Sequence, residues 1–563
     1  MKKLSTTIIS SMLVFLLILT GCTSKGEKGT ASSNTTGKTT EEKVTPPGTF
    51  PIVKEKQNLV VFAPQDPYVE DYNTNEFTKW YEEKTNIHVV WEIVPAAGLK
   101  EKVQLKLAGS DLPDVFLQSQ ITDASLVMYG SQGLFIPLND LIEKYAPNVK
   151  NMLKKSPYVQ DFMVTPNGNI YHIPNVGEVF HSTMPKKAWI YKPWLDTMGL
   201  KVPTTTEEFY ETLKAFKTRD PNGNGKADEV PLAGADGEKN GNNEIESYLM
   251  QSFLFYERGN YLMNNNGKIE FAADKPEYKD ALRYIKKLID EKLLLAESFT
   301  QDRKALTALG EDPGGCRLGA ATSLYWAHFT VDKGPSGRYK EYVPLPVLKG
   351  PSGKAFGYDR GYSPSIGSGI GTFVITKNCK IPEAAMRWMD TIYDLEKDLE
   401  LEFNPSMGKP GIGWKRPDPG TKGIDGRPAT YEAIVTFGTK QNVHWSQTLN
   451  GYNSNDYRLS GSAKDEIEVR LYNATKDLYK PFSALNQKVP FMFLSEEQLT
   501  KTGDLRTAMH KVVQTFMVKF VTGNLDLDKD WNTYLKELEN AGVKEYVKVT
   551  QDAYNENQKA KKK

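Results

Sequence analysis

The chain has 563 residues, of which 71 are lysine or arginine and 70 are aspartate or glutamate, so its formal net charge is +1. A charge this close to zero argues against bulk nucleic-acid binding, which leaves a strongly basic surface. The length is sufficient for two or more lobes that each bury a hydrophobic core.

The N-terminus has the regions of an exported lipoprotein in the usual order. Lys2 and Lys3 precede an apolar stretch, Ile8 to Leu19, that is too short to span a bilayer comfortably. These features predict a signal peptide over residues 1–21. The stretch runs into Leu-Thr-Gly-Cys22, which resembles a bacterial lipobox. Acylation of Cys22, with palmitate for example, would anchor the protein on the extracytoplasmic face of the cell membrane. An ordinary signal peptide with a chance cysteine is the alternative.

Residues 22–52 are rich in threonine, serine, glycine and lysine, and they contain almost no apolar side chains. Such a stretch cannot bury enough surface to offset its ordering entropy, so we expect a flexible tether. No later stretch approaches 18 consecutive apolar residues, so we expect no other membrane-spanning segment.

Strand and helix patterns alternate after the tether. Apolar and β-branched residues predict strands at 58–63, 87–93 and 111–117. Between them, helical spacing of apolar residues predicts helices around 77–81 and over 99–107. This alternation predicts an α/β lobe with a largely parallel sheet.

The later part of the chain adds helices and another strand. Thr204 and Glu207 have the spacing of a capping box, and an amphipathic pattern follows them. Residues 371–376 form a predicted strand, and the next helix opens on a proline. Apolar stripes at 509–520 and 531–538 predict a helical C-terminal part.

Several segments together resemble large bacterial extracellular solute-binding proteins of the sugar-binding kind. They are Leu107-Ala-Gly-Ser-Asp-Leu-Pro-Asp114, Trp194-Leu-Asp-Thr-Met-Gly-Leu-Lys-Val-Pro-Thr-Thr205, Asp220-Pro-Asn-Gly-Asn-Gly225 and the tail from Phe520 through Tyr534. They occur in order and cover nearly all of the chain after the signal peptide. The chain is therefore identified as a member of that family (family 1), similar to LipO-type lipoproteins and to alginate-oligosaccharide-binding proteins.

The resemblance implies an α/β, two-lobe type II periplasmic-binding fold with the ligand cleft between the lobes. By family analogy, residues 53–180 and 366–420 form the N-terminal lobe, and residues 181–365 and 421–555 form the C-terminal lobe. It also implies a monomer without enzymatic activity that closes on an oligosaccharide and delivers it to the permease subunits of an ABC importer. A ligand sensor for a membrane kinase stays open as an alternative, and so does a peptide ligand.

One loop carries oxygen ligands at the spacing of a calcium site. Asp220, Asn222, Asn224 and Asp228 take loop positions 1, 3, 5 and 9, with a glycine at position 6. The loop departs from an EF-hand at its end, where Glu229 takes position 10. It resembles the calcium loop of the alginate-binding relatives. We expect a structural Ca²⁺ held by Asp220, Asn222, Asn224, Lys226 (through its carbonyl), Asp228 and Glu229; a metal-free turn is the alternative.

Ligand contacts are assigned by family analogy and by position after strands. Residues at the carboxyl ends of strands line the crevice of open α/β sheets, which favours Gln118 and Ser119. Tryptophan rings stack on pyranose faces, which favours Trp326 and Trp414. The full set of candidates is Trp326, Tyr325, Trp414, Gln118, Ser119, Arg360, Trp445 and Asp66. Core packing is the alternative for each aromatic residue.

A secreted polysaccharide-degrading enzyme is the competing function. The six histidines show no zinc-binding spacing, and the sequence contains no Gly-x-Ser-x-Gly elbow and no P-loop. The 70 acidic residues guarantee chance pairs, so a pair of carboxylates does not by itself indicate a glycosidase. The binding function is favoured over the enzyme by the lipobox and by the full-length resemblance.

Two cysteines remain after Cys22. Cys316 and Cys379 would lie in an oxidising exterior, where a disulfide is possible. We expect two separate buried thiols, because nothing in the sequence brings the two residues together.

Overall fold

The computed structural model describes residues 44–236, 243–363, 371–393, 403–435, 439–445, 452–453 and 467–560. The predicted signal peptide and Cys22 lie outside these ranges, as does most of the predicted tether. Within the described ranges, every helix is too short or too polar to span a bilayer.

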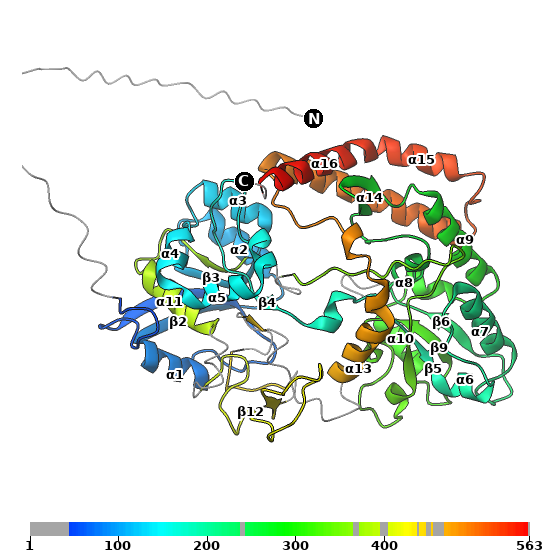
Figure 1. Cartoon of the computed structure of the whole chain (residues 1–563), viewed down its shortest axis with the longest axis horizontal. Coiled ribbons are helices and arrows are strands. Elements are labelled where there is room, and N and C mark those ends of the chain that lie inside the picture. Colours follow the sequence, from blue (N-terminus) through cyan, green and yellow to red (C-terminus); the bar gives the residue numbers. More distant parts are fainter. Residues whose placement is uncertain are drawn as a thin grey trace, which may run out of the picture. The chain divides into compact units, whose positions relative to one another are not determined.

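The first lobe, at the left of Figure 1, is built on a four-stranded sheet in the order β11-β3-β1-β2. Its strands are β1 (Gln57–Pro64), β2 (Ile87–Val94), β3 (Val115–Ile121) and β11 (Gly371–Ile375). β1 pairs in parallel with β2 and β3, while β11 is antiparallel to β3. Helices α1 (Glu76–Thr85) and α2 (Leu99–Ala108) are the crossovers between parallel strands. The predicted α/β lobe with a largely parallel sheet is confirmed.

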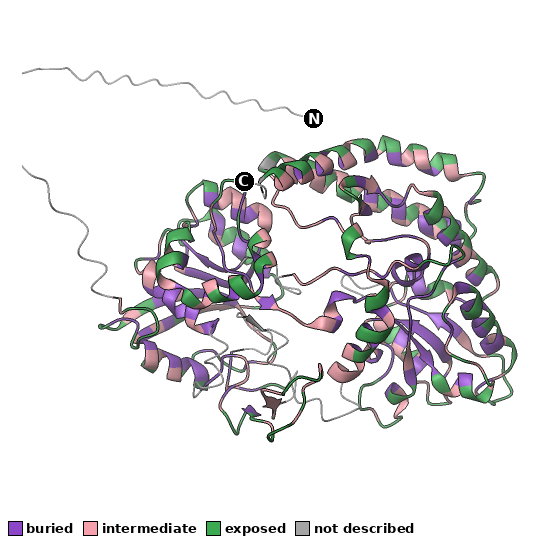
Figure 2. Ribbon diagram, viewed as in Figure 1, coloured by how far each residue is buried: buried purple, intermediate pink, exposed green. Residues whose placement is uncertain are grey.

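Side chains of this sheet alternate between two cores, as the pleat of a strand requires. Val115 and Leu117 join the larger core, whereas Phe116 joins a smaller one on the opposite face. The larger core is covered by α1, α4 (Asn139–Tyr145), α5 (Pro147–Lys155) and α11 (Pro382–Ile392); the smaller is covered by α2 and α3 (Asp123–Ser131). Helices therefore enclose the sheet on both faces, and Figure 2 shows its strands buried between them.

The second lobe is built on another four-stranded sheet, in the order β10-β5-β9-β6. Its strands are β5 (Ala188–Tyr191), β6 (Val230–Ala233), β9 (Leu318–Thr322) and β10 (Tyr342–Leu345). β6 is parallel to β9, and β5 is antiparallel to both β9 and β10. The carboxyl ends of β6 and β9 therefore meet the amino end of β5 at one edge of the sheet.

Helices of the second lobe come from the middle and the end of the chain. The longest of those described are α7 (Thr206–Thr218), α9 (Pro276–Asp290), α14 (Glu496–Val521), α15 (Trp531–Asn540) and α16 (Val543–Ala560). Their apolar faces share one core with the sheet. The predicted stripes at 509–520 and 531–538 lie in α14 and α15, whereas the sequence analysis did not predict α16.

The third crossing of the chain between the lobes lies further along the sequence than predicted. Trp445 belongs to the core of the first lobe, where it packs edge-on against Phe77 and Trp91 at ring-centroid distances of 4.8 and 5.4 Å. The second core resumes with Leu471 in α13 (Ile467–Ala474). The boundary predicted at residue 420 is wrong, because residues 439–445 are held by contacts with the first lobe.

The folded body also begins earlier than residue 53. Val44 pairs antiparallel with Val53, and Ile52 is fully buried in the first core. The guanidinium of Arg387 on α11 donates to the carbonyl oxygen of Thr49 at 2.7 Å. This short hairpin-like segment is therefore part of the first lobe rather than of the tether.

The segments that link the lobes are bound to one another near the second lobe. The Gln251 amide donates to the carbonyl of Lys186 at 3.0 Å and accepts from the Tyr358 N–H at 2.8 Å. Fully buried Asp359 accepts from Lys480 Nζ at 2.7 Å and from Ser483 Oγ at 2.6 Å. Three linking segments are thus joined by hydrogen bonds into one unit.

The predicted start of α7 and the predicted end of β3 are wrong, whereas the prediction of two separate buried thiols is confirmed. The N-cap of α7 is Thr205, whose side chain accepts from the Glu208 N–H at 3.1 Å, so the predicted cap at Thr204 is one residue early. β3 continues through Ile121 instead of ending at Leu117. Cys316 and Cys379 are free, buried thiols in different cores.

Candidate ligand-binding site

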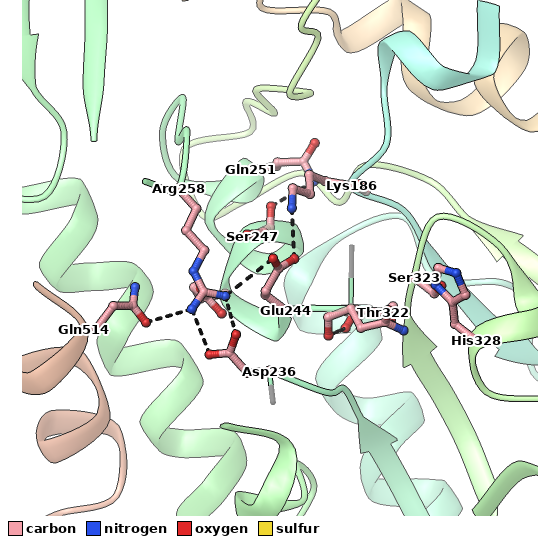
Figure 3. Close-up of polar contacts among 12 residues, drawn as sticks. Lys186, Asp236, Glu244, Ser247, Gln251, Arg258, Thr322, Ser323, His328 and Gln514 are labelled. Carbon is pink, nitrogen blue, oxygen red and sulfur yellow. Dashed lines mark hydrogen bonds and ion pairs between the residues drawn. The ribbon is translucent and has the colours of Figure 1, made fainter. Parts of the chain in front are cut away.

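Charged side chains gather at the edge of the second sheet where β6 and β9 end (Figure 3). Asp236 follows β6, Ser323 follows β9, and Lys186 precedes β5. Glu244 immediately precedes the short helix α8 (Ile245–Leu249). Loops at this edge line the crevice in open α/β sheets, so the sheet topology places these groups where ligands bind.

Arg258 is at the centre of this polar cluster. Its Nη1 and Nη2 donate to the two carboxylate oxygens of Asp236 at 2.6 and 2.8 Å, a bidentate arrangement. Nη2 also donates to Oε1 of Gln514 on α14 at 3.1 Å. Nη1 lies 3.5 Å from Glu244, and Nε lies 3.2 Å from Glu246. Burial lowers the pKa of Arg258, but the neighbouring carboxylates outweigh that effect and raise it.

The second cation of the cluster is also bound to a carboxylate. Lys186 Nζ donates to Glu244 Oε2 at 2.9 Å, and the two side chains are 15% and 11% exposed. Glu246 is fully buried, and burial raises its pKa to about 7, although the charge of Arg258 acts in the opposite direction. The cluster is therefore largely shielded from solvent, and Lys186 and Glu244 keep a small exposed fraction.

Several buried polar atoms of this region have no hydrogen-bond partner. They are Asn243 Oδ1, Ser247 Oγ and both carboxylate oxygens of Glu246. Figure 3 shows Ser247 beside Lys186 and Glu244. Buried polar atoms are nearly always hydrogen-bonded in folded proteins, so unpaired ones indicate a place for a ligand or for water.

Polar and aromatic groups of both lobes also face each other. Ser323 Oγ lies 2.9 Å from His328 Nδ1, and the Tyr325 ring packs on His328. Burial raises the pKa of Tyr325, and Tyr68 of the first lobe is close enough to contribute. Asp66 holds the turn before Tyr68, because its Oδ1 accepts from the Tyr68 N–H at 2.7 Å.

A cavity of about 500 Å³ lies where the lobes and linkers meet. The first lobe contributes Asp123 and Phe162, the second lobe contributes Glu257, Asn260 and Leu262, and the remaining walls come from the linkers, α14 and α16. Phe162 stacks on Phe491 with 4.5 Å between ring centroids. This volume and the mixture of aromatic and polar walls are typical of small-ligand sites. Arg360 lines the same cavity.

The expectation of an exposed ring face is wrong for Trp326, Trp414 and Trp445, which are all at most 1% exposed. Their indole N–H groups donate within the protein, to Asp332 Oδ1, to the Gly408 carbonyl and to Thr78 Oγ1, respectively. Long-range packing, which a single sequence does not display, encloses all three rings.

The other predicted ligand residues divide into two groups. Ser119 is buried, and its hydroxyl donates to the backbone of β1 and β3, so it is a packing residue of the sheet. Tyr325, Asp66, Gln118 and Arg360 are partly exposed and stay candidates.

Sequence reasoning missed five residues of the polar cluster, namely Lys186, Asp236, Glu244, Arg258 and Gln514. The strand-end rule could have found Asp236, whereas the others meet it only through the fold.

The predicted calcium loop joins α7 to β6. The Asp220 carboxylate accepts from the N–H groups of Asn224 and Gly225 at 3.2 and 2.9 Å. Asp228 Oδ1 accepts from the side-chain amides of Asn222 and Asn224 at 3.2 and 3.1 Å. No three His, Cys, Asp or Glu side chains in the described ranges are gathered closely enough to hold a metal ion.

The donor atoms of this loop nevertheless suit a hard cation. They are carboxylate, amide and carbonyl oxygens, which calcium prefers. Glu229 Oε1 is buried without a hydrogen-bond partner. Burial and the nearby charges of Asp220 and Asp228 raise the pKa of Glu229. A cation would relieve this repulsion, so the residues present fit the predicted ion.

Comparison with known proteins identifies the family. Residues 65–396 match the family model for bacterial extracellular solute-binding proteins. The chain belongs to this family. The relatives described below are likewise named as binding proteins or as a lipoprotein rather than as enzymes, and the prediction that the chain is not an enzyme is confirmed.

Relatives extend the match over nearly the whole chain. The fructooligosaccharide ABC transporter substrate-binding protein FusA of Streptococcus pneumoniae is 29% identical over 520 residues, covering 91% of this chain and 92% of FusA. The structure of FusA in complex with kestose has a TM-score of 0.69 at 26% identity, and the match covers 89% of this chain and the whole of the chain in that structure. A further FusA structure is that of an EF-hand mutant with fructo-nystose.

Other relatives are more distant. A solute-binding protein of Bifidobacterium longum subsp. infantis has a TM-score of 0.74 at 22% identity, covers 89% and 98% of the two chains, and confirms the fold. The polygalacturonan/rhamnogalacturonan-binding protein YtcQ of Bacillus subtilis is 28% identical over 280 residues, half of each chain. Lipoprotein LipO of the same organism is 25% identical over 340 residues, 59% of this chain and 62% of LipO, and this confirms the predicted resemblance to LipO-type lipoproteins.

Proposed function

We propose that the protein captures an oligosaccharide outside the cell and delivers it to the permease subunits of an ABC importer. The observation that carries this proposal is the polar cluster around Arg258 at the carboxyl ends of β6 and β9. Carboxylates, amides and hydroxyls at such an edge bond the many hydroxyls of a sugar. The similarity to FusA over the full chain supports an oligosaccharide rather than a peptide.

In this mechanism, binding energy drives a change of shape and no covalent bond changes. An oligosaccharide that contacts both lobes binds the closed arrangement more tightly than the open one and shifts the population toward it. Hydrogen-bonding groups on the two sides of the ligand come from Tyr68 and Asp66 in the first lobe and from Tyr325 in the second. The closed form is the one that the permease recognises.

The test is isothermal titration calorimetry of the protein without residues 1–22 against a panel of oligosaccharides that begins with kestose. We expect saturable binding of at least one oligosaccharide, with a matching rise in melting temperature by mass action. Analysis of the ligand by chromatography afterwards should return it uncleaved. Cleavage, or the absence of binding across the panel, would contradict the proposal.

We also propose that the loop from Asp220 to Glu229 binds a structural calcium ion. The oxygen donor set and the unpaired Glu229 oxygen support this, as does the EF-hand named in the FusA mutant. The ion would fix the end of α7 relative to the start of β6. It would thereby steady the strand that presents Asp236.

Finally, we propose a lipid anchor at Cys22 that holds the protein at the outer face of the cell membrane and leaves the body monomeric. The lipobox-like Leu-Thr-Gly-Cys sequence and the relative LipO support the anchor. Mass spectrometry of the membrane fraction should find Cys22 acylated, and Cys22→Ser should release the protein into the medium.

A further inference from the structure

The charge balance of the polar cluster bears on which oligosaccharides it accepts. Two cations, Lys186 and Arg258, face three carboxylates, those of Asp236, Glu244 and Glu246. The carboxylates outnumber the cations by one when all three are ionised, and the excess of negative charge is smaller where Glu246, whose pKa burial raises to about 7, is protonated. Side-chain exposure is between 0% and 15% for all five, so water screens these charges weakly.

Both cations already have carboxylate partners. All three nitrogens of the Arg258 guanidinium have partners in the protein. Nη1 and Nη2 donate to Asp236, Nη2 also donates to Gln514, and Nε forms an ion pair with Glu246. Lys186 is bound to Glu244 at 2.9 Å. A carboxylate on a ligand could reach Arg258 only by displacing one of these partners. Lys186 Nζ keeps two further N–H groups, but a ligand carboxylate bound there would lie beside the carboxylate of Glu244 and be repelled by it.

The unused hydrogen-bonding capacity of the cluster is mainly that of acceptors. Glu246 Oε2 and Asn243 Oδ1 are buried without a hydrogen-bond partner, and Glu246 Oε1 has only the ion-pair contact with Arg258 Nε at 3.2 Å. Each ionised carboxylate has about four lone-pair sites, so Asp236 and Glu244 also keep spare acceptor capacity. Hydroxyl groups donate to such acceptors, whereas an ionised uronate group can only accept.

We infer that the cluster around Arg258 selects neutral, hydroxyl-rich oligosaccharides and rejects acidic ones, with the excess of carboxylates as the specificity determinant. This inference rests on the proposed function. It distinguishes between relatives named for a fructooligosaccharide and for polygalacturonan, a choice that family membership leaves open.

The test compares neutral oligosaccharides with oligogalacturonates of equal length by calorimetry, using the whole chain without residues 1–22. We expect the best neutral ligand to bind at least about 100-fold more tightly than any oligogalacturonate. Glu244→Gln removes one carboxylate and frees Lys186, so this ratio should fall at least about tenfold. Glu539→Gln, which breaks an exposed ion pair with Lys544, is the matched control and should leave the ratio unchanged.

The outcomes separate the inference from the proposed function. If neither class binds, the proposed function fails. If oligogalacturonate binds as tightly as the neutral ligand, the inference is overturned while the proposed function stands. The same holds if Glu244→Gln and Glu539→Gln give equal ratios. Asp236→Asn serves as the second variant if Glu244→Gln does not fold, and the wild-type comparison alone tests the preference for neutral ligands.

Discussion

At the scale of single residues, Trp326 is held on several sides by its own lobe. The guanidinium of Arg470 lies 3.8 Å from its ring centroid, and Trp189 packs edge-on against it at 5.3 Å. Its indole N–H donates to Asp332 at 2.7 Å. These contacts use both the ring and its polar atom, so the residue stabilises the second lobe.

Trp326→Ala should therefore lower the free energy of unfolding by about 3–5 kcal/mol, the usual range for removing a buried aromatic side chain. Urea unfolding followed by circular dichroism measures this change. Calorimetry on the folded protein should show a much smaller effect on oligosaccharide affinity. A variant of normal stability that has lost its affinity would mean that the ring stacks on the ligand after all.

Glu246 should make stability depend on pH in a defined direction. Burial raises its pKa from 4.5 to about 7, so the folded state binds this proton more readily than the unfolded state does. Its contribution to the free energy of unfolding therefore falls as pH rises from about 4.5 to 7. His328 and His444, with pKa values lowered by burial to about 3 and 4, act in the opposite direction over part of this range.

Glu246→Gln isolates the carboxylate from the histidines, because glutamine has nearly the same shape and does not titrate. We expect the stability of the variant relative to wild type to increase steadily between pH 4.5 and 7.5. Urea unfolding of both proteins at four pH values gives this difference. A difference that is constant with pH would show that Glu246 does not titrate in this window.

At the scale of elements, the loop from Asp220 to Glu229 determines how β6 starts. With calcium present, EDTA should lower the melting temperature of the wild type, and added calcium should restore it. Asp228→Asn should have the lower melting temperature already and respond little to EDTA, because it removes a charged ligand. Asp280→Asn, on the exposed surface of α9, is the matched control and should respond to EDTA like the wild type.

Elements with regular apolar patterns were predictable from the sequence, and those fixed by distant contacts were not. β1, β2, α2, α11 and the stripes of α14 and α15 follow their local patterns. α16 buries Val543, Tyr546, Val549 and Ala553, but most of its other residues are polar, and its packing on α14 decides its place. The crossing set at residue 420 was wrong because Trp445 reaches the first core through contacts more than 350 residues away in sequence.

The candidate site was predictable only in outline. The rule that ligands bind at the carboxyl ends of strands pointed to Gln118 and Ser119, which lie within β3 (Val115–Ile121), and it could not select Arg258 or Gln514. Arg258 bonds to Asp236, and Gln514 on α14, almost 280 residues after Asp236, joins the cluster only through its hydrogen bond with Arg258. Of the aromatic residues after β9, Trp326 proved to be core, whereas Tyr325 is partly exposed.

At the scale of the whole molecule, ligand binding should bring the lobes together. Small-angle X-ray scattering should record a smaller radius of gyration when the protein is saturated with a bound oligosaccharide than when it is free. A sugar from the same panel that does not bind is the control and should change nothing. An unchanged radius at saturation would contradict closure as the mechanism.

The two free cysteines lie in different hydrophobic cores, Cys379 in the first lobe and Cys316 in the second. Each thiol is therefore protected from alkylation only while its own lobe stays intact. Brief exposure to an alkylating reagent during denaturation, followed by peptide mass spectrometry, measures how fast each cysteine becomes accessible, and so how fast each lobe unfolds. Cys316 and Cys379 therefore report which lobe unfolds first, and no engineered label is needed.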